Sequence, residues 1–397
     1  MNREIKIAIF GAPVNNSNLG CQALTYSLID LLEEISKEKE IGFTYYIFEW
    51  NPSDAATQRF IKTANIISNK LYSVKQGNLH DFMRRCKNVF VNKNMKDILE
   101  KCQYVIDLTE GDSFTDIYGD YRFDTQTKLK QLAECMGLKL ILASQTYGPF
   151  TKEKNAVFAA DVIKNAYRVF ARDKISADYV TKISDIVPEL TCDLAFRLPY
   201  EKTKRNGFNT LKSVGLNVSG LLVNNSSEDT KKEFELKTDY DEYLDRLIQF
   251  LLNKDYSVTL IGHVEADYDA INRLKNTYPQ LKTAPAFENP IQAKSYISAF
   301  DLFIGSRMHA TIAALTSGVP VIPVAYSRKF SGLFDFVNYP FVVDLQKMGT
   351  DDSVKTTEQY ISNYQELVQV VGNSYKIAMD KVDDCYKKYS VIFDELK

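Results

Sequence analysis

The chain has 397 residues, of which 45% are hydrophobic and 25% are charged, and its formal net charge is −2. This composition is ordinary for a globular protein, and the length predicts two or three domains. Because the charges nearly balance, no global basic field exists to recruit nucleic acid or anionic lipid, and nucleic acid is not an expected partner.

The apolar segments and the cysteines set the expected compartment. No run of about 18 apolar residues occurs, and the apolar stretch near the start is too short for a signal peptide. The six cysteines are scattered without a CxxC motif, a pattern typical of reduced protein. We therefore expect a cytoplasmic protein without a transmembrane segment, with at most peripheral contact at the inner face of the membrane.

The chain opens with an apolar run of strand length at residues 5–10. The polar turn GAPVNNSNLG follows, and then a helical spacing of apolar residues over 21–32. This is a Rossmann-like opening without a GxGxxG dinucleotide fingerprint. In the turn, Asn15, Asn18 and Gly20 offer amides and close backbone approach to a substrate, although Asn and Gly are also ordinary turn formers.

A second strand is predicted over residues 43–50, whereas residues 51–94 show no clear register. The next strand, over 104–108, is followed by a turn that contains Glu110 and Asp112. Two carboxylates directly after a strand are typical of a turn that contacts a ligand, so both are candidate substrate-binding residues.

The first half continues with a predicted helix over 119–136 and a strand over 138–143, and the turn after that strand carries Gln145. A short strand over 167–170 leads to Arg172 and to a helix from about residue 174. Gln145 and Arg172 thus follow neighbouring strands, where ligands of open α/β sheets collect.

A charged segment without apolar periodicity, residues 200–209, is predicted to be the linker between domains. The boundaries that follow are 1–200 for an N-terminal domain and 201–356 for a C-terminal domain. The remaining residues, 357–397, are expected to form helices that pack back across the domains, with a break near 372–373. The second half again alternates strands and helices: strands from 213 and over 256–262, and helices over 239–253, 266–277 and 290–299.

Residues 301–336 carry the most informative pattern of the chain. A buried strand over 302–304 ends in Gly305-Ser306, where Ser306 is a good helix N-cap. A helix over 310–315 and a strand over 319–324 follow, which makes a βαβ unit. Its turn holds Arg307 and His309, and Lys329 follows the second strand.

These residues predict an anion site with a proton-transfer group beside it. Backbone N–H groups at the helix start and the Arg307 guanidinium favour carboxylate or phosphate, and His309 titrates near neutral pH. Positions two apart on a helix diverge by roughly 200°, so both side chains reach one ligand only if Arg307 lies in the turn itself. The alternative is that His309 only packs or caps.

Strands that alternate with helices in both halves predict an α/β protein with two Rossmann-like domains facing across a cleft, followed by C-terminal helices. Both halves place their polar turns at strand ends, so both are expected to line that cleft.

Five turns together resemble those of the polysaccharide pyruvyl transferases: GAPVNNSNLGCQA, DLTEGDSF, QTYGPF, ARDKIS and GSRMHATIAALTSGVPVIPVAYSRK. The resemblance spans roughly residues 4–336, and its most specific part is the R-x-H-x-x-x-x-A-L-x-x-G-x-P core at 307–320 with RD-x-x-S at 172–176. The sequence departs from the family at Thr109-Glu110-Gly111-Asp112, where a glycine-rich turn is common, and at Thr146-Tyr147, where smaller residues are common.

The resemblance implies a GT-B-like fold and transfer of the pyruvyl group of phosphoenolpyruvate onto two hydroxyls of a sugar, giving a cyclic ketal and phosphate. It implies that Arg307, His309 and Arg172 are the donor-binding and catalytic residues. With them we group the substrate-binding candidates Asn15, Asn18, Gly20, Glu110, Asp112, Gln145, Ser306 and Lys329.

The expected partners are phosphoenolpyruvate, as co-substrate, and a sugar or glycan acceptor, which includes lipid-linked ones. We expect no cofactor and no obligatory metal, because no His, Cys or Asp cluster has metal-ligand spacing. Two alternatives stay open. One is a nucleotide-sugar glycosyltransferase of the same architecture, although the Glu-x7-Glu element that retaining members often use does not stand behind the helix that starts at Arg307. The other is a non-catalytic glycan-binding module.

Overall fold

The computed structural model describes residues 4–66, 70–76, 93–203, 210–223, 231–232 and 234–394. The chain forms two compact units. Unit 1 comprises Met1–Asn16, Leu24–Leu194 and Lys381–Lys397, and unit 2 comprises Ser17–Ala23 and Ala195–Asp380. The division therefore falls after Leu194, and residues 204–209 of the predicted linker lie outside the described residues.

The described residues of unit 1 form one sheet of seven parallel strands in the order β3-β2-β1-β4-β5-β6-β7. The strands are β1 (Glu4–Phe10), β2 (Gly42–Glu49), β3 (Leu71–Lys75), β4 (Tyr104–Asp107), β5 (Lys139–Gln145), β6 (Arg168–Ala171) and β7 (Glu189–Leu190). Their central members are apolar runs with nearly every residue buried, as parallel strands covered on both faces require.

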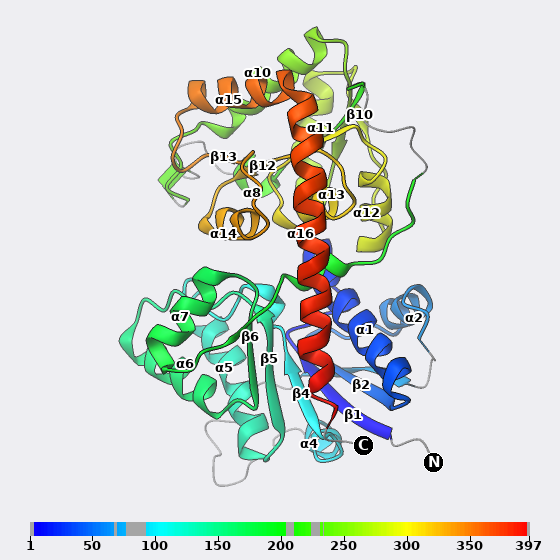
Figure 1. Cartoon of the computed structure of the whole chain (residues 1–397), viewed down its shortest axis with the longest axis vertical. Coiled ribbons are helices and arrows are strands. Elements are labelled where there is room, and N and C mark those ends of the chain that lie inside the picture. The colour runs from blue at the N-terminus through cyan, green and yellow to red at the C-terminus, as the bar shows by residue number, and fades with distance from the viewer. Residues whose placement is uncertain are drawn as a thin grey trace. The chain divides into compact units, whose positions relative to one another are not determined.

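Helices cover both faces of this sheet, as Figure 1 shows. They are α1 (Leu19–Lys39), α2 (Asp54–Thr63), α4 (Lys93–Leu99), α5 (Asp120–Cys135), α6 (Glu153–Asn165) and α7 (Lys174–Ser184). One core cluster packs strands β1, β4 and β5 against α5 and α6 through residues such as Val105, Leu129 and Leu142.

The described residues of unit 2 form a second parallel sheet of six strands, in the order β10-β9-β8-β11-β12-β13. The strands are β8 (Ser213–Asn217), β9 (Ser257–Ile261), β10 (Lys282–Thr283), β11 (Leu302–Gly305), β12 (Val321–Ala325) and β13 (Val343–Asp344). The helices are α8 (Gly220–Val223), α10 (Tyr240–Asn253), α11 (Asp267–Thr277), α12 (Pro290–Ile297), α13 (Met308–Leu315), α14 (Arg328–Phe336), α15 (Thr350–Ser362) and α16 (Tyr364–Val391). The prediction of two Rossmann-like α/β units is thus confirmed.

Three local predictions differ from the structure. Residues 51–94 show no clear pattern in the sequence, and their described part contains α2 and β3. Helix α6 was also not predicted. The helix break near residues 372–373 is wrong, because α16 runs through Gly372 and the interruption lies at Asn363. One glycine in an exposed helix interior costs only about 1 kcal/mol, so it weakens a long helix without ending it.

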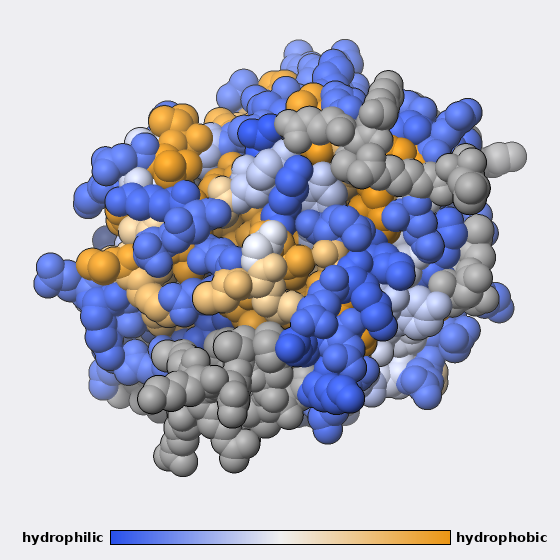
Figure 2. Space-filling view, turned by 90° about the horizontal axis from the view of Figure 1, so that it is seen from below, coloured by the Kyte–Doolittle hydropathy of each residue, from blue (hydrophilic) through white to orange (hydrophobic). Residues whose placement is uncertain are grey.

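The surface in Figure 2 is largely hydrophilic, with hydrophobic residues grouped near the middle of the face shown. Large hydrophobic side chains that are exposed in the described residues include Trp50, Ile117, Tyr118, Tyr121 and Val157. Among the helices described, none is long and apolar enough to cross a membrane.

Candidate functional site

Each sheet reverses its strand order at one point, between β1 and β4 in unit 1 and between β8 and β11 in unit 2. Polar loops leave the carboxyl ends of these strands, and ligands of doubly wound sheets bind at such switch points. The predicted turns with Asn15, Glu110 and Arg307 all start there. The two switch points are therefore the candidate sites of the two units.

Arg307 is fixed in unit 2 by a buried carboxylate that sequence reasoning missed. The Arg307 Nη2 lies 2.6 Å from Oδ1 of Asp267, and Nε lies 3.1 Å from the same oxygen. Asp267 is fully buried, whereas the Arg307 side chain keeps 14% of its exposure. Burial disfavours the guanidinium charge, but Asp267 outweighs this effect and raises the pKa of Arg307. Arg307 is thus a permanently charged group in one fixed orientation.

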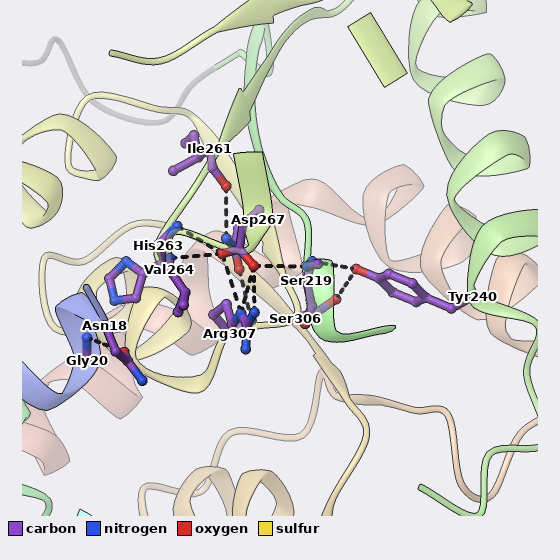
Figure 3. A network of polar contacts seen from close by, with 12 residues as sticks. Asn18, Gly20, Ser219, Tyr240, Ile261, His263, Val264, Asp267, Ser306 and Arg307 are labelled. Carbon is purple, nitrogen blue, oxygen red and sulfur yellow. Dashed lines mark hydrogen bonds and ion pairs between the residues drawn. The ribbon is translucent and has the colours of Figure 1, made fainter. Parts of the chain in front are cut away.

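Asp267 also organises the loops around it, and Figure 3 shows it at the centre of the network. It accepts hydrogen bonds from the backbone N–H groups of Gly220, at 2.9 Å, and of His263 and Val264, both at 3.0 Å. A Cβ on Gly220 would lie 1.8 Å from the carbonyl oxygen of Ala266, so only glycine allows this approach. One carboxylate therefore joins the loops after β8 and β9 to Arg307.

Arg307 and His309 can reach one ligand only if Arg307 lies in the turn before the helix, and the backbone meets this condition. Arg307 is the N-cap of α13 in an extended conformation, so it lies in the turn, two residues before His309 on the helix. Its N–H donates to Oδ1 of Asn217 at 2.8 Å, and the Asn217 amide donates to the Ile261 carbonyl at 2.9 Å. Both side chains thus leave the same switch point.

The predicted capping role of Ser306 is wrong. The N-cap is Arg307, and the Ser306 hydroxyl lies 2.7 Å from the hydroxyl of Tyr240. Ser306 is almost fully buried, and burial raises the pKa of Tyr240 to about 12. The pair joins α10 to the end of β11, which supports the loop of Arg307 from behind.

The first asparagine turn contributes to this same region. Asn18 and Gly20, which the sequence grouped with Asn15, belong to the segment Ser17–Ala23 of unit 2. The Asn18 side chain accepts from the N–H of Gly20 at 2.9 Å, and the N–H of Leu19 donates to the His263 carbonyl at 3.1 Å. A Cβ on Gly20 would lie 2.4 Å from Nδ1 of His309. The start of α1 is thus packed directly on the His309 imidazole.

His263 is the second residue that sequence reasoning left without a role. Its side chain is buried, and neither ring nitrogen has a hydrogen-bond partner in the described residues. Burial, and then the nearby His309 and Arg307, lower the pKa of His263 to about 3. His263 is therefore neutral at physiological pH. Lys329, the remaining predicted cation of this half, is the second residue of α14.

In unit 1 the loop after β4 has an unusual backbone. Thr109, Glu110 and Gly111 all have positive φ, at 43°, 53° and 87°. Glycine tolerates such conformations, and other residues adopt them at a cost, which persists mainly at functional sites. This geometry explains why a glycine-rich turn suits the position. A Cβ on Gly11 would lie 2.5 Å from the Thr109 nitrogen, so the loop packs tightly on the turn after β1.

Glu110 is held by Arg122 of α5. Its Oε2 lies 2.7 Å from Nη2 of Arg122, which also donates to Ser113 at 2.8 Å. Burial raises the pKa of Glu110; Arg122 opposes the rise and Asp112 adds to it. Asp112 accepts from the Tyr118 hydroxyl at 3.3 Å. A carboxyl with a raised pKa at a strand end is suited to exchange a proton with a substrate.

Arg172 repeats in unit 1 the arrangement of Arg307. It is 3% exposed, its Nη1 lies 2.9 Å from Oδ2 of Asp193, and its Nη2 is buried without a partner in the described residues. The Gln145 amide donates to the Asp107 carbonyl at 3.1 Å, while its Oε1 is also buried without a partner in this part of the chain. Tyr147, the bulky departure from the family pattern, is buried and donates to the Phe170 carbonyl at 2.9 Å. It fills the core of unit 1.

Unit 1 also contains a pocket of about 200 Å³ at the carboxyl ends of β1 and β2. Asn15 and Glu110, two predicted substrate residues, line it, together with Trp50. The Asn15 N–H donates to the buried Glu49 carboxylate at 3.1 Å, and the Asn15 amide donates to the Asn51 carbonyl at 3.0 Å. Asn15 thus belongs to unit 1, whereas Asn18 and Gly20 belong to unit 2.

No group of three or more His, Cys, Asp or Glu in the described part of the chain is arranged to hold a metal ion. The candidate residues instead fall into two sets, one in each unit. The unit 2 set can bind an anion beside an imidazole, and the unit 1 set offers carboxylates and amides to a polar neutral ligand.

The fold places the protein among α/β proteins of the GT-B-like type. A putative UDP-N-acetylglucosamine 2-epimerase from Listeria monocytogenes is similar, with a TM-score of 0.59, 11% identity, and coverage of 95% of this chain and 91% of that one. The UDP-GlcNAc 2-epimerase from Neisseria meningitidis gives a TM-score of 0.55 at 10% identity, with coverage of 96% and 100%. At such identities the likeness concerns the fold alone.

The sequence identifies the family within this class. The family model "Polysaccharide pyruvyl transferase" matches residues 18–328, which is most of the chain and includes Arg172, Arg307 and His309. The amylovoran biosynthesis protein AmsJ from Erwinia amylovora is 20% identical over 308 residues, covering 72% of this chain and 73% of its own. The chain belongs to the polysaccharide pyruvyl transferase family.

Proposed function

We propose that this protein transfers the pyruvyl group of phosphoenolpyruvate onto two hydroxyls of a sugar in a polysaccharide or its precursor, forming a cyclic ketal and releasing phosphate. The observation that carries the proposal is the Arg307–Asp267 pair beside His309 at the switch point of unit 2. Membership of the family supports the same reaction. We place the reaction in the cytoplasm. If the acceptor is lipid-linked, the reaction takes place at the inner face of the membrane.

The fixed Arg307 is suited to bind the donor. Its Nε and Nη2 contact Asp267, and Nη1 makes no hydrogen bond to any described residue. The Nη1 edge can therefore donate to the carboxylate or the phosphate of phosphoenolpyruvate without reorienting the side chain. We propose that the first turn of α13 and Lys329 contribute further N–H groups and charge to the trianion.

The chemistry requires one acid and one base. The methylene carbon of the enol gains a proton and becomes a methyl group, which leaves a cationic carbon for the first sugar hydroxyl to attack. Phosphate then leaves, and the second hydroxyl closes the ring. Two hydroxyl protons are released: one replaces the proton given to the methylene carbon, and the other leaves with phosphate. We assign the donated proton to His309 and the acceptance of a hydroxyl proton to Glu110.

The neutral His263 beside His309 fits this assignment. A second imidazolium next to His309 and Arg307 would raise the local positive charge and disfavour a protonated His309. Because burial keeps His263 uncharged, His309 and Arg307 face the donor anion without that repulsion.

The donor assignment is tested by binding. Arg307→Ala should weaken phosphoenolpyruvate binding at least tenfold, since a charge-assisted hydrogen bond contributes roughly 1.5–3 kcal/mol. Arg246→Ala is the matched control, because Arg246 is a partly exposed arginine of the same unit that pairs with Glu242 and Asp351. Calorimetry that finds equal affinity for both variants would refute a donor site at Arg307.

The proton-transfer assignment is tested by single-turnover phosphate release from phosphoenolpyruvate in the presence of a sugar acceptor. His309→Asn should slow release by roughly 10²–10⁴-fold with an unchanged melting temperature. If His309 only packs on Gly20, the same variant should turn over at nearly the wild-type rate. Consumption of a nucleotide sugar, with no phosphate released from phosphoenolpyruvate, would instead favour a glycosyltransferase.

A further inference from the structure

The pocket of unit 1, which we call the Trp50 pocket, contains two buried amide side chains that the proposed chemistry does not use. Gln76 follows β3 and Gln126 belongs to α5; both line the pocket and each is 5% exposed. Nε2 of Gln76 and Oε1 of Gln126 are buried without a hydrogen-bond partner in the described residues. Within this part of the chain, the walls of the pocket therefore contain one unpaired donor and one unpaired acceptor.

Such atoms are costly in a protein core, and the hydroxyls of a bound ligand could pair with them. Leaving a buried polar atom unpaired costs more than the hydrogen bond itself gains, so two in one pocket point to a ligand. A hydroxyl group both donates and accepts hydrogen bonds, so hydroxyls can pair with an amide N–H and with an amide carbonyl. A ligand with several hydroxyls is the class that fits best.

The walls of the pocket add an aromatic face. Trp50 directly follows β2, lines the pocket and is 38% exposed. An indole ring presents a large apolar surface at a low entropy cost, and it suits the C–H face of a pyranose ring. The volume of about 200 Å³ lies below the roughly 300–1,000 Å³ of sites for drug-sized ligands. The pocket is the size for a single ring.

The charge of the lining selects among sugars. Glu49 and Glu110 line the pocket, and the described lining residues include no lysine or arginine. Glu49 is satisfied by the N–H groups of Val14 and Asn15, both at 3.1 Å, so it positions the loop after β1. An added carboxylate or phosphate would face the carboxyl groups of Glu49 and Glu110 and would find no cation among the described lining residues to pair with.

We propose that the Trp50 pocket binds one uncharged sugar ring of the acceptor, with its hydroxyls on Gln76 and Gln126 and its apolar face on Trp50. This inference rests on the proposed function, because it names the class of acceptor. Uronic acids and sugar phosphates should bind this position more weakly than neutral sugars.

The chain supplies its own probe, because Trp50 is its single tryptophan. Intrinsic fluorescence is measured while the full chain is titrated with methyl glycosides of galactose, glucose, mannose and N-acetylglucosamine, and with the methyl glycosides of galacturonate and glucuronate. We expect a saturable change with at least one neutral glycoside, and at least tenfold weaker binding of its uronate counterpart. Equal or tighter binding of the uronates, or no saturable change with any neutral glycoside, overturns the proposal.

Two variants separate hydrogen bonding from shape. Gln76→Met and Gln126→Met keep the length of the side chain and remove the amide, and the circular dichroism spectrum of each variant should match that of the wild type. Each should weaken the neutral glycoside about tenfold, whereas the control Gln249→Met, at an exposed position of α10, should not. Unchanged binding in both pocket variants overturns the assignment of the amides.

The test distinguishes the failure of this inference from the failure of the proposed function. If phosphoenolpyruvate and an acceptor release phosphate but no neutral glycoside reaches Trp50, the pocket assignment fails and the transferase stands. If glycosides bind at Trp50 but no acceptor supports phosphate release, the transferase fails and the sugar pocket stands.

Discussion

Replacing Asp267 by Asn should destabilise the protein more than replacing Arg307 by Gln, although both changes remove the same ion pair. The reason is that the residue left behind keeps other hydrogen-bond partners in one variant and, among the described residues, not in the other. Asp267 also accepts hydrogen bonds from the backbone N–H groups of Gly220, His263 and Val264, so it stays satisfied without Arg307. The hydrogen bonds of the Arg307 guanidinium within the described residues all go to Asp267.

The magnitude follows from these hydrogen bonds. Removal of one partner of a buried pair costs about 3–5 kcal/mol when the other charge is left uncompensated, which describes Asp267→Asn. The new NH₂ group would also face an N–H donor in either orientation, because both oxygens of Asp267 accept from backbone donors. Arg307→Gln loses only charge-assisted hydrogen bonds of the pair and should cost about 1.5–3 kcal/mol.

The assay is urea unfolding at neutral pH followed by circular dichroism, with Trp50 fluorescence as a second probe to test for a single transition. Arg246→Gln and Asp351→Asn, which divide a solvent-exposed ion pair of the same unit, are the controls and should change stability little and equally. If Arg307→Gln were as destabilising as Asp267→Asn, the three backbone N–H groups would not be sufficient to stabilise the Asp267 carboxylate without its arginine.

Two further predictions concern the surroundings of His309. The pKa of His263 lies near 3 in the folded state, below its usual 6.5, so its contribution to stability is present above pH 6.5 and is lost as the pH falls. Between pH 7 and 4.5 this loss should be about 2.5 kcal/mol. His263→Met should remove it from unfolding curves at the two pH values, whereas an unchanged pH dependence would contradict a buried neutral His263. Gly20→Ala should displace His309 and lower turnover, whereas the control Gly372→Ala, where a Cβ meets nothing within 4 Å, should stabilise α16 by about 0.5–1 kcal/mol. Wild-type turnover of Gly20→Ala would show that His309 does not depend on this contact.

The sequence predicted those parts of the fold that a local pattern encodes. Continuous apolar runs gave the central strands β1, β4 and β11 to within about two residues, because parallel strands buried on both faces admit little else. Strand β3 was missed because only two of its five residues are fully buried, which leaves a weak pattern at the edge of the sheet. The polar turns were found for the same reason as the strands, since each begins where an apolar run ends.

The partners within the site could not be predicted in this way. Asp267 reaches Arg307 across 40 residues, and in the sequence it is only an acidic residue in the first turn of a helix, a common position for stabilising charge. The contact of Gly20 with His309 joins the first helix of the chain to α13. No sequence pattern marks Gln76 as a candidate. It stands out only because its Nε2 is buried and unpaired within the described residues, which depends on the packing around it.

The two arginines of the family pattern are held in similar ways, and this affects how each can interact with an anion. Arg172 and Arg307 each follow a strand of their unit, and each is held by an almost fully buried aspartate, Asp193 or Asp267. Each pair is neutral overall, so neither arginine contributes a large long-range field to attract an anion from solution. What each pair keeps is a guanidinium of fixed orientation, with Nη2 of Arg172 and Nη1 of Arg307 lacking a hydrogen bond in the described residues. Donors that are fixed before the substrate arrives lose little entropy on binding and need no reorganisation as charge develops. The arginines are therefore better suited to orient a bound anion, and to stabilise the charge that moves onto it during reaction, than to capture it.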